Sequence, residues 1–228
     1  MRSDVARDLG DSAFEFLRVV WPQIEPWMSG GELYPVEAVS HDGFNKHLDA
    51  LAGIDAWQIK HNHGIRGIAS RVQWIDPDNP KHKRFDTFSI RTKRPNGAET
   101  EFAKRMRIIR DPDGGWLLPE FTVQAYVSEP KREGELLSVA VVRTRQLFMR
   151  AHMLMIQFET ASRRDWGMNA AGNGGEEFVW LHWDYIKREM PDAIRVYRRP
   201  ENILLPDPVW LSQYDGKHNG HDNTRRPQ

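Results

Sequence analysis

Three strand-like segments follow one another in the first half of the chain, and a helix-like segment flanks them on each side. This order constrains the fold more than any other feature of the sequence. The strands are expected at 54–60, 65–75 and 85–92, and the flanking helices at 42–53 and 99–109. The simplest way to bury this pattern is a sheet covered by helices. The sequence therefore predicts an α/β (α+β) fold with a central mixed sheet flanked by helices.

Further helix and strand patterns extend this core. Apolar residues at helical spacing predict a helix over 14–24, capped by Asp11 or Ser12 and ended or kinked by Pro22 and Pro26. Strands are also expected at 33–39, 121–127, 136–142 and 178–183, helices at 144–155 and 184–190, and an irregular Gly- and Asn-rich loop at 162–177. We predict a single domain over residues 1–211, followed by a polar, disordered tail at 212–228.

Composition narrows the class of protein. Hydrophobic residues make up 39% of the 228 residues, which is enough apolar mass for one core. Lys plus Arg and Asp plus Glu both total 32, so the net charge is zero. This balance argues against a nucleic-acid binder that relies on the charge of its whole surface, and it leaves room for a local basic groove.

The chain has no cysteine, so it can form neither a disulfide nor a thiolate zinc site. A reducing cytosol is the natural home of such a chain, and we expect a cytoplasmic protein. Residues 1–11 lack the apolar centre of a signal peptide, and the apolar run at 136–142 is far shorter than a bilayer span. We therefore expect no insertion into a membrane.

Two polar residues on neighbouring strands form the most suggestive candidate site. Asp55 stands at the leading edge of one expected strand, and Gln73 lies on its hairpin partner. Together they can present two oxygen ligands to a hard cation such as Mg²⁺, which usually keeps several waters. Such an ion can activate water and stabilise charge on a phosphate under attack.

At these residues the chain resembles the PD-(D/E)XK nuclease superfamily over about 42–127. Members run helix, three strands, helix, strand, with a glycine–hydrophobic–aspartate pattern on one strand and (D/E/Q)-x-K on the next. Gly53, Ile54 and Asp55 match the first pattern, and Gln73 can stand at the first position of the second. The resemblance implies a restriction-endonuclease-like core and a metal-dependent nuclease that acts on or binds DNA, with Asp55 and Gln73 as metal ligands.

The chain departs from the superfamily pattern after Gln73. Ile75 stands where members carry lysine, so a cation would have to come from Arg91 or Arg71, and Glu37 can replace an acidic residue that many members carry upstream. Alternation places Arg71 and Gln73 on one strand face, and Ser89 and Arg91 on one face of the next strand. This polar stripe indicates either a site or an exposed sheet face with cross-strand hydrogen bonds.

Basic residues gather near this candidate site. The candidates for contact with nucleic-acid phosphates are Lys93, Arg94, Lys104, Arg105 and Arg107, and Lys81, Lys83 and Arg84 form a further group. Local charge of this kind can hold a phosphate backbone. The alternative is a solvated surface, since acidic residues are interleaved and Glu101 can pair with Lys104 one helical turn away.

Other motifs favour structural roles. His61 and His63 precede Gly64 in a pattern typical of a hairpin turn, and Trp183 and Tyr185 are expected in the core rather than stacked on bases. The leading hypothesis is a divergent, Mg²⁺-dependent, nuclease-like protein. Its rival is a non-catalytic module that binds a protein partner, and a small-molecule enzyme is a third option. The substrate and the oligomeric state are left open.

Overall fold

The computed structural model describes residues 10–36, 53–60, 64–76, 79, 84–114, 117–129, 131, 133–157, 165–170 and 175–200. Several sequence predictions lie outside these residues. They concern Glu37, nearly all of the helix at 42–53, the histidines of the 61–63 turn, Lys81 and Lys83, the glycine-rich stretch at 172–174, and the tail at 212–228.

A six-stranded mixed sheet forms the centre of the fold. Its strands lie in the order β1 (Glu32–Pro35), β2 (Ala56–Lys60), β3 (Gly64–Ile75), β5 (Phe121–Ser128), β6 (Leu136–Arg143) and β9 (Ile194–Arg198). The pairing is antiparallel except between β3 and β5. The predicted α+β class with a mixed sheet is thus confirmed, and Lys60 pairs with Gly64 across the expected hairpin.

A second sheet contains three antiparallel strands in the order β4 (Thr87–Lys93), β8 (Glu177–His182) and β7 (Trp166–Ala170). The third of the consecutive predicted strands, β4, therefore does not extend the main sheet beside β3. Burial explains this position, because Phe88 and Ile90 of β4 are buried in a core made by the second sheet and the helices. Strand β7 also corrects the irregular loop expected at 162–177.

The helical segments begin and end at recognisable signals. Residues 10–15 are helical, so Asp11 and Ser12 lie inside this first segment rather than at its cap. The chain continues through η1 (Phe16–Val20), α2 (Trp21–Ile24) and η2 (Glu25–Met28). Ser29 then ends the segment in a left-handed conformation, with φ 62°.

Four further helical elements lie later in the described chain: α4 (Glu101–Arg110), η4 (Pro112–Gly114), α5 (Thr144–Gln157) and α6 (Trp183–Glu189). Thr100 caps α4, because its hydroxyl accepts a hydrogen bond of 3.2 Å from the backbone N–H of Ala103. No helix in the described part of the chain is long and apolar enough to span a bilayer.

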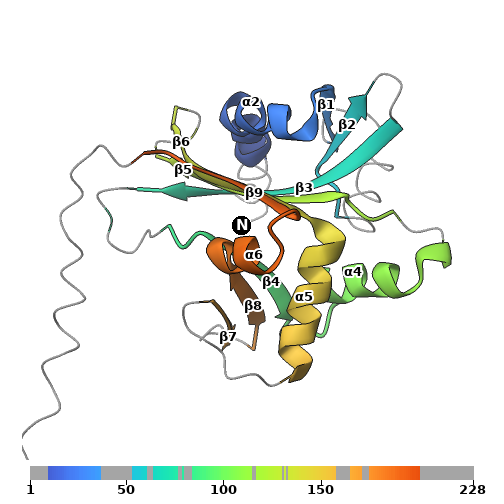
Figure 1. Cartoon of the computed structure of the whole chain (residues 1–228). Helices are drawn as coiled ribbons and strands as arrows, with labels where there is room; N and C mark the ends of the chain where they lie inside the picture. The colour runs from blue at the N-terminus through green and yellow to red at the C-terminus, as the bar shows by residue number, and fades with distance from the viewer. Residues whose placement is uncertain are drawn as a thin grey trace, which may run out of the picture.

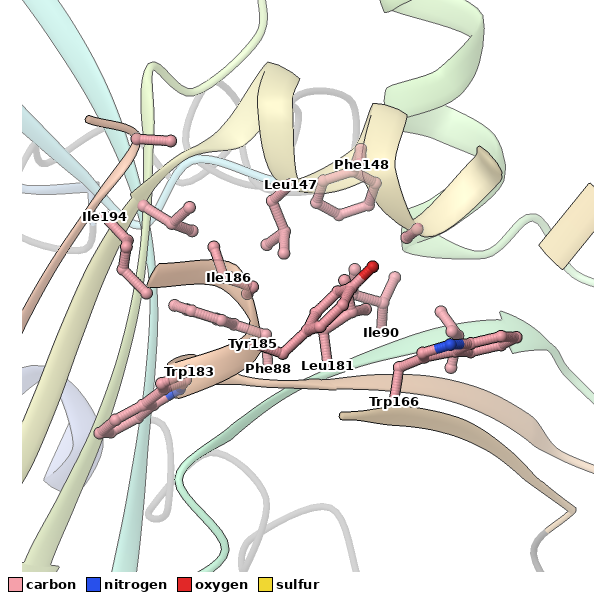
Figure 2. Packing of buried hydrophobic residues seen from close by; sticks show 14 of the residues in the cluster. Phe88, Ile90, Leu147, Phe148, Trp166, Leu181, Trp183, Tyr185, Ile186 and Ile194 are labelled. Atoms are coloured by element: carbon pink, nitrogen blue, oxygen red, sulfur yellow. The ribbon is translucent and has the colours of Figure 1, made fainter. Parts of the chain in front are cut away.

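Helices cover both faces of the main sheet, as Figure 1 shows. The N-terminal helical segment packs on one face through Val20 and Ile24. Helices α4, α5 and α6 and the second sheet lie on the other face (Figure 1). Side chains from α5, α6, β4, β7 and β8 point toward one another there (Figure 2), among them Leu147, Phe148, Tyr185, Ile186, Phe88, Ile90, Trp166 and Leu181.

A buried ionic network also joins the two sheets. Asp86, which precedes β4, is 7% exposed and adopts a positive φ of 49°. Its carboxylate accepts hydrogen bonds from Ser138 Oγ at 3.1 Å and from Arg198 Nε at 2.7 Å. Arg198 also donates to Asp184 of α6 at 2.9 Å. Because Ser138 and Arg198 belong to β6 and β9, this network fixes the start of β4 against the main sheet.

Candidate anion-binding cavity

A cavity of about 250 Å³ lies where the main sheet, β4, α4 and α5 meet. Its charged lining consists of four cationic side chains and two carboxylates, and hydroxyl and amide groups add to it. The charged residues are Arg71, Arg94, Lys104, Arg105, Asp55 and Glu101. Phe148 and Leu147 of α5 supply part of an apolar wall. The described lining therefore carries an excess of two positive charges.

The hairpin of β2 and β3 places Asp55 in this cavity. Ala56 pairs with Ile68, so Asp55, the preceding residue, lies beside Ala69 and Ser70 of β3. One Asp55 carboxylate oxygen accepts a hydrogen bond of 2.5 Å from the backbone N–H of Ser70. The backbone N–H of Asp55 donates to the Ile68 carbonyl at 2.9 Å. These contacts fix the Asp55 carboxylate just before the first residue of β2.

Arg71 follows on β3 and connects the two sheets across the cavity. Its guanidinium donates a hydrogen bond of 3.2 Å to the backbone carbonyl of Ser89 in β4. Arg71 pairs with Gln124 of β5 in the strand register, and both residues line the cavity. The predicted shared face of Arg71 and Gln73 is consistent with the alternation of β3. The stripe does not cross two paired strands, however, because β4 is not a neighbour of β3.

Arg105 of α4 is the most buried charge in the cavity, with an exposure of 3%. Its guanidinium donates to Thr122 Oγ1 at 3.1 Å and to the Gly53 carbonyl at 3.3 Å, and it pairs with Glu101 at 2.8 Å. The guanidinium carbon lies 4.8 Å from the centre of the Phe148 ring. The buried Nε atom of Arg105 has no hydrogen-bond partner in the described part of the chain.

The electrostatic surroundings of Arg105 have opposing parts. Burial lowers the pKa of Arg105, because a buried group loses the hydration of its charge. The carboxylates of Glu101 and Asp55 raise this pKa, and the nearby charge of Arg71 lowers it again. Two guanidinium groups thus lie close enough to repel each other at the wall of one cavity. An anion between them would reduce that repulsion.

Arg94 and Lys104 complete the cationic lining. Arg94 follows the last residue of β4, and its buried Nε has no hydrogen-bond partner among the described residues. Lys104 lies one residue before Arg105 on α4 and is half-buried. Of the predicted phosphate contacts, Arg94, Lys104 and Arg105 are therefore brought together.

The remaining basic candidates lie outside the cavity in ion pairs. Arg91 lies 3.6 Å from Glu176 and over the Phe178 ring, and Lys93 pairs with Glu177 at 2.9 Å. Arg107 pairs with Glu99 at 3.2 Å. None of these three cations lines the cavity. The partly buried Arg91 is held by Glu176 and Phe178 and does not join Asp55.

Gln73 does not join Asp55. The register places Gln73 four residues beyond Ala69 along β3, which corresponds to about 13 Å at ~3.3 Å per residue. The side-chain carbonyl of Gln73 accepts a hydrogen bond of 3.3 Å from Gln124 Nε2 instead. The sequence pairing of Asp55 with Gln73 implies a hairpin register shifted by four residues from the observed one. The turn expected at 61–64 already indicates the observed register, because the position of a hairpin turn determines which residues of the two strands are opposite each other.

The observed register places Ala69 beside Asp55, and Arg71 follows two residues later on β3. Ala69 offers no side-chain oxygen at that position, whereas Arg71 brings a cation into the cavity. Glu101, the other carboxylate in the lining, pairs with Arg105 at 2.8 Å.

This donor set fits an anion better than a divalent cation. The lining holds four cations, and the part of the chain that the structure describes has no group of three or more residues of the kinds that ligate metals. Mg²⁺ prefers oxygen ligands, and Gln73 does not supply one in the cavity. The Mg²⁺ ion at Asp55 stays a prediction from the sequence, and no chemical step is assigned to it.

The sequence does not predict three of the polar residues in the cavity. Ser70, Thr122 and Gln124 line it with hydroxyl and amide groups, beside Ser89 of the predicted polar stripe. Each lies on a strand, where an isolated polar residue is typical of an exposed face. Gln124, 3% exposed between residues that are also buried, is the exception that could have been noticed, because it interrupts an apolar strand.

Comparison with known proteins adds no assignment to this geometry. No family model matches the chain, and neither a curated protein nor a solved structure shows significant similarity to it. The cavity itself is therefore the basis for a functional argument. Guanidinium groups, an ammonium group and hydroxyls around one space are the groups that bind phosphate and other oxyanions.

Proposed function

We propose that this protein is a divergent nuclease-like protein that binds DNA by holding a phosphate group in the cavity. The observation that carries the proposal is that Asp55 and Arg71, from paired strands, line one cavity with Arg94, Lys104 and Arg105. Phosphate contacts from arginine and lysine supply most of the affinity of proteins for nucleic acids. The zero net charge of the chain is compatible with this proposal, because the cations act locally.

Salt dependence of DNA binding tests the proposal. Each cation that neutralises a phosphate on a single strand contributes about 0.7 to the slope of log affinity against log salt. Because the cavity holds one phosphate group, we expect the full chain to bind a fluorescent single-stranded oligonucleotide with a slope of about −0.7 or steeper. Affinity is measured by fluorescence anisotropy between about 50 and 200 mM salt.

Two matched pairs of variants localise the binding. Lys104→Gln and Arg107→Gln each remove a cation from α4, but only Lys104 lines the cavity. Arg94→Gln and Lys93→Gln form a second pair at the end of β4. We expect the cavity variants to lose affinity and about 0.7 of the salt slope, and the surface variants to keep both. Equal effects within each pair would place binding on the outer surface instead.

The catalytic form of the proposal is tested with the same oligonucleotide. Since Ala69 offers no ligand beside Asp55, we expect intact DNA after incubation with Mg²⁺ or Mn²⁺. Cleavage that disappears in Asp55→Ala would instead support the metal-dependent nuclease that the sequence predicts. Absence of any salt-sensitive binding to DNA or RNA would refute the proposal and favour a module for a protein partner.

A further inference from the structure

The charge and the size of the cavity indicate which kind of phosphate group it binds. That the phosphate belongs to a nucleic-acid strand rests on the proposed function. The described lining has two positive charges in excess. An internal phosphodiester carries one negative charge, whereas a phosphate monoester carries about −1.5 to −2 at neutral pH. A monoester dianion therefore matches the cavity charge more closely than an internal backbone phosphate does.

Unsatisfied donors point to the same ligand. The Nε atoms of Arg105 and Arg94 are buried and have no hydrogen-bond partner among the described residues. Arg105 is 3% exposed and lines the cavity, so a ligand bound there can supply the missing acceptor. A buried donor without an acceptor costs about 1–3 kcal/mol, and a charged one costs more. The three terminal oxygens of a phosphate monoester offer the acceptors that these guanidinium groups lack.

Size favours a single phosphate group over a whole nucleotide. The cavity of about 250 Å³ has room for the equivalent of about eight waters at ~30 Å³ each. This volume is somewhat below the ~300–1,000 Å³ typical of pockets for whole small ligands. The cavity therefore suits the phosphate group of a larger ligand whose remaining part lies outside it.

We propose that the cavity is a site for a phosphate monoester dianion, such as the phosphorylated end of a nucleic-acid strand. Arg105 of α4 and Arg71 of β3 contact the phosphate, together with Lys104 of α4 and Arg94, which directly follows β4. Ser70 and Thr122 line the same space and add hydroxyl groups. The same chemistry is present in a free nucleoside monophosphate, so the test separates the two sources.

The experiment compares oligonucleotides of one sequence that differ only at their ends. They carry a 5′-phosphate, a 3′-phosphate, two hydroxyl ends, or a 5′-phosphate methyl ester, which keeps the phosphorus centre but has one added methyl group, two terminal oxygens and a single negative charge. Adenosine monophosphate and inorganic phosphate compete at constant ionic strength. We expect one phosphorylated end to bind at least about tenfold more tightly than the hydroxyl and methyl-ester forms, as one charge-assisted hydrogen bond predicts.

Variants assign the preference to the cavity. Arg71→Gln should reduce the end preference to within about twofold, and Arg105→Lys should weaken it while keeping the charge, because lysine lacks the planar fork of arginine. Arg107→Gln is the control on the same helix and should keep the full preference. Thermal melting of each variant identifies loss of folding, and Arg94→Gln repeats the test if Arg105→Lys does not fold.

Each outcome decides between the claims. Salt-sensitive binding without any preference for a phosphorylated end overturns this inference and leaves the proposed function standing. Binding of adenosine monophosphate without binding of any oligonucleotide supports the monoester site and overturns nucleic-acid binding. Failure of every phosphate-containing probe to bind overturns both.

Discussion

At the scale of single residues, the charges that matter most in this protein are buried. Arg105 and Asp86 are both less than a tenth exposed, and both hold several partners from distant parts of the chain. They differ in whether every hydrogen-bonding atom of the charged group has a partner. Asp86 is surrounded by donors, whereas Arg105 keeps one donor without a partner in the described chain. Asp86 therefore supports the fold, and Arg105 keeps the donor on which the proposed phosphate site depends.

The structural role of Asp86 gives the first prediction. Asp86→Asn keeps the shape of the side chain and tolerates the positive φ, but it removes the buried charge opposite Arg198. Leaving Arg198 partly uncompensated should lower the free energy of unfolding by about 3 kcal/mol. Urea denaturation measures this change.

Asp184→Asn is the matched control, since Asp184 contacts the same arginine from the surface. Its side chain is 59% exposed, so its loss should cost less than about 1 kcal/mol. Equal losses in the two variants would show that burial does not set the strength of this network.

At the scale of elements, helix α4 carries two cavity cations and begins at a capping threonine. Thr100→Ala removes the hydroxyl that accepts from Ala103 N–H. We expect a loss of about 1 kcal/mol in stability and weaker ligand binding, because Lys104 and Arg105 lie in the first turns of this helix. Thr100→Ser keeps the hydroxyl and should keep both properties. Urea denaturation and anisotropy measure the two effects.

Strand β7, which lies in a segment that the sequence predicts to be an irregular loop, gives a second prediction. A Cβ on Gly167 would lie 2.6 Å from the Trp180 ring of β8. Gly167→Ala should therefore lower stability by about 1–3 kcal/mol through overpacking and change tryptophan fluorescence. Met168→Ala, on an exposed neighbour in the same strand, should change stability by less than about 0.5 kcal/mol.

Elements with a clear local pattern could be predicted from the sequence, whereas strand pairing between distant segments could not. The strands β2, β3, β5 and β6 and the helices α4, α5 and α6 have clear periodicity or capping signals, and their positions were predicted within a few residues. The placement of β4 in a second sheet was not predictable, because it depends on pairing with β8, about 90 residues later. Strand β9 was missed although Ile194–Arg198 partly alternates apolar and basic residues, a pattern that favours a strand.

The candidate site was predictable in part for the same reason. Asp55, Arg71, Lys104, Arg94 and Arg105 were identified by residue type and by nearness to the hairpin, and they line one cavity. Gln73 was misplaced because its pairing with Asp55 departs from the register that the turn expected at 61–64 indicates, and Arg91 because sheet membership is a property of the folded chain. A one-residue or four-residue shift of register leaves the sequence pattern unchanged but changes which side chains meet.

At the scale of the whole molecule, the cavity lies between parts that are far apart in sequence. Its walls come from β3, β4, β5, α4 and α5, so a ligand bound there contacts both sheets and two helices. Such a ligand binds the folded state and not the unfolded chain. Binding should therefore be coupled to the stability of the entire domain.

This coupling gives the last prediction. At a ligand concentration of about 100 times its dissociation constant, the free energy of unfolding should rise by about 2.7 kcal/mol. A phosphorylated oligonucleotide should thus raise the melting temperature of the full chain, measured by differential scanning fluorimetry. The increase should disappear in Arg71→Gln and persist in Lys93→Gln, whose cation lies outside the cavity. An equal increase in both variants would mean that the stabilising contacts lie on the surface, because only a ligand held between the two sheets depends on Arg71.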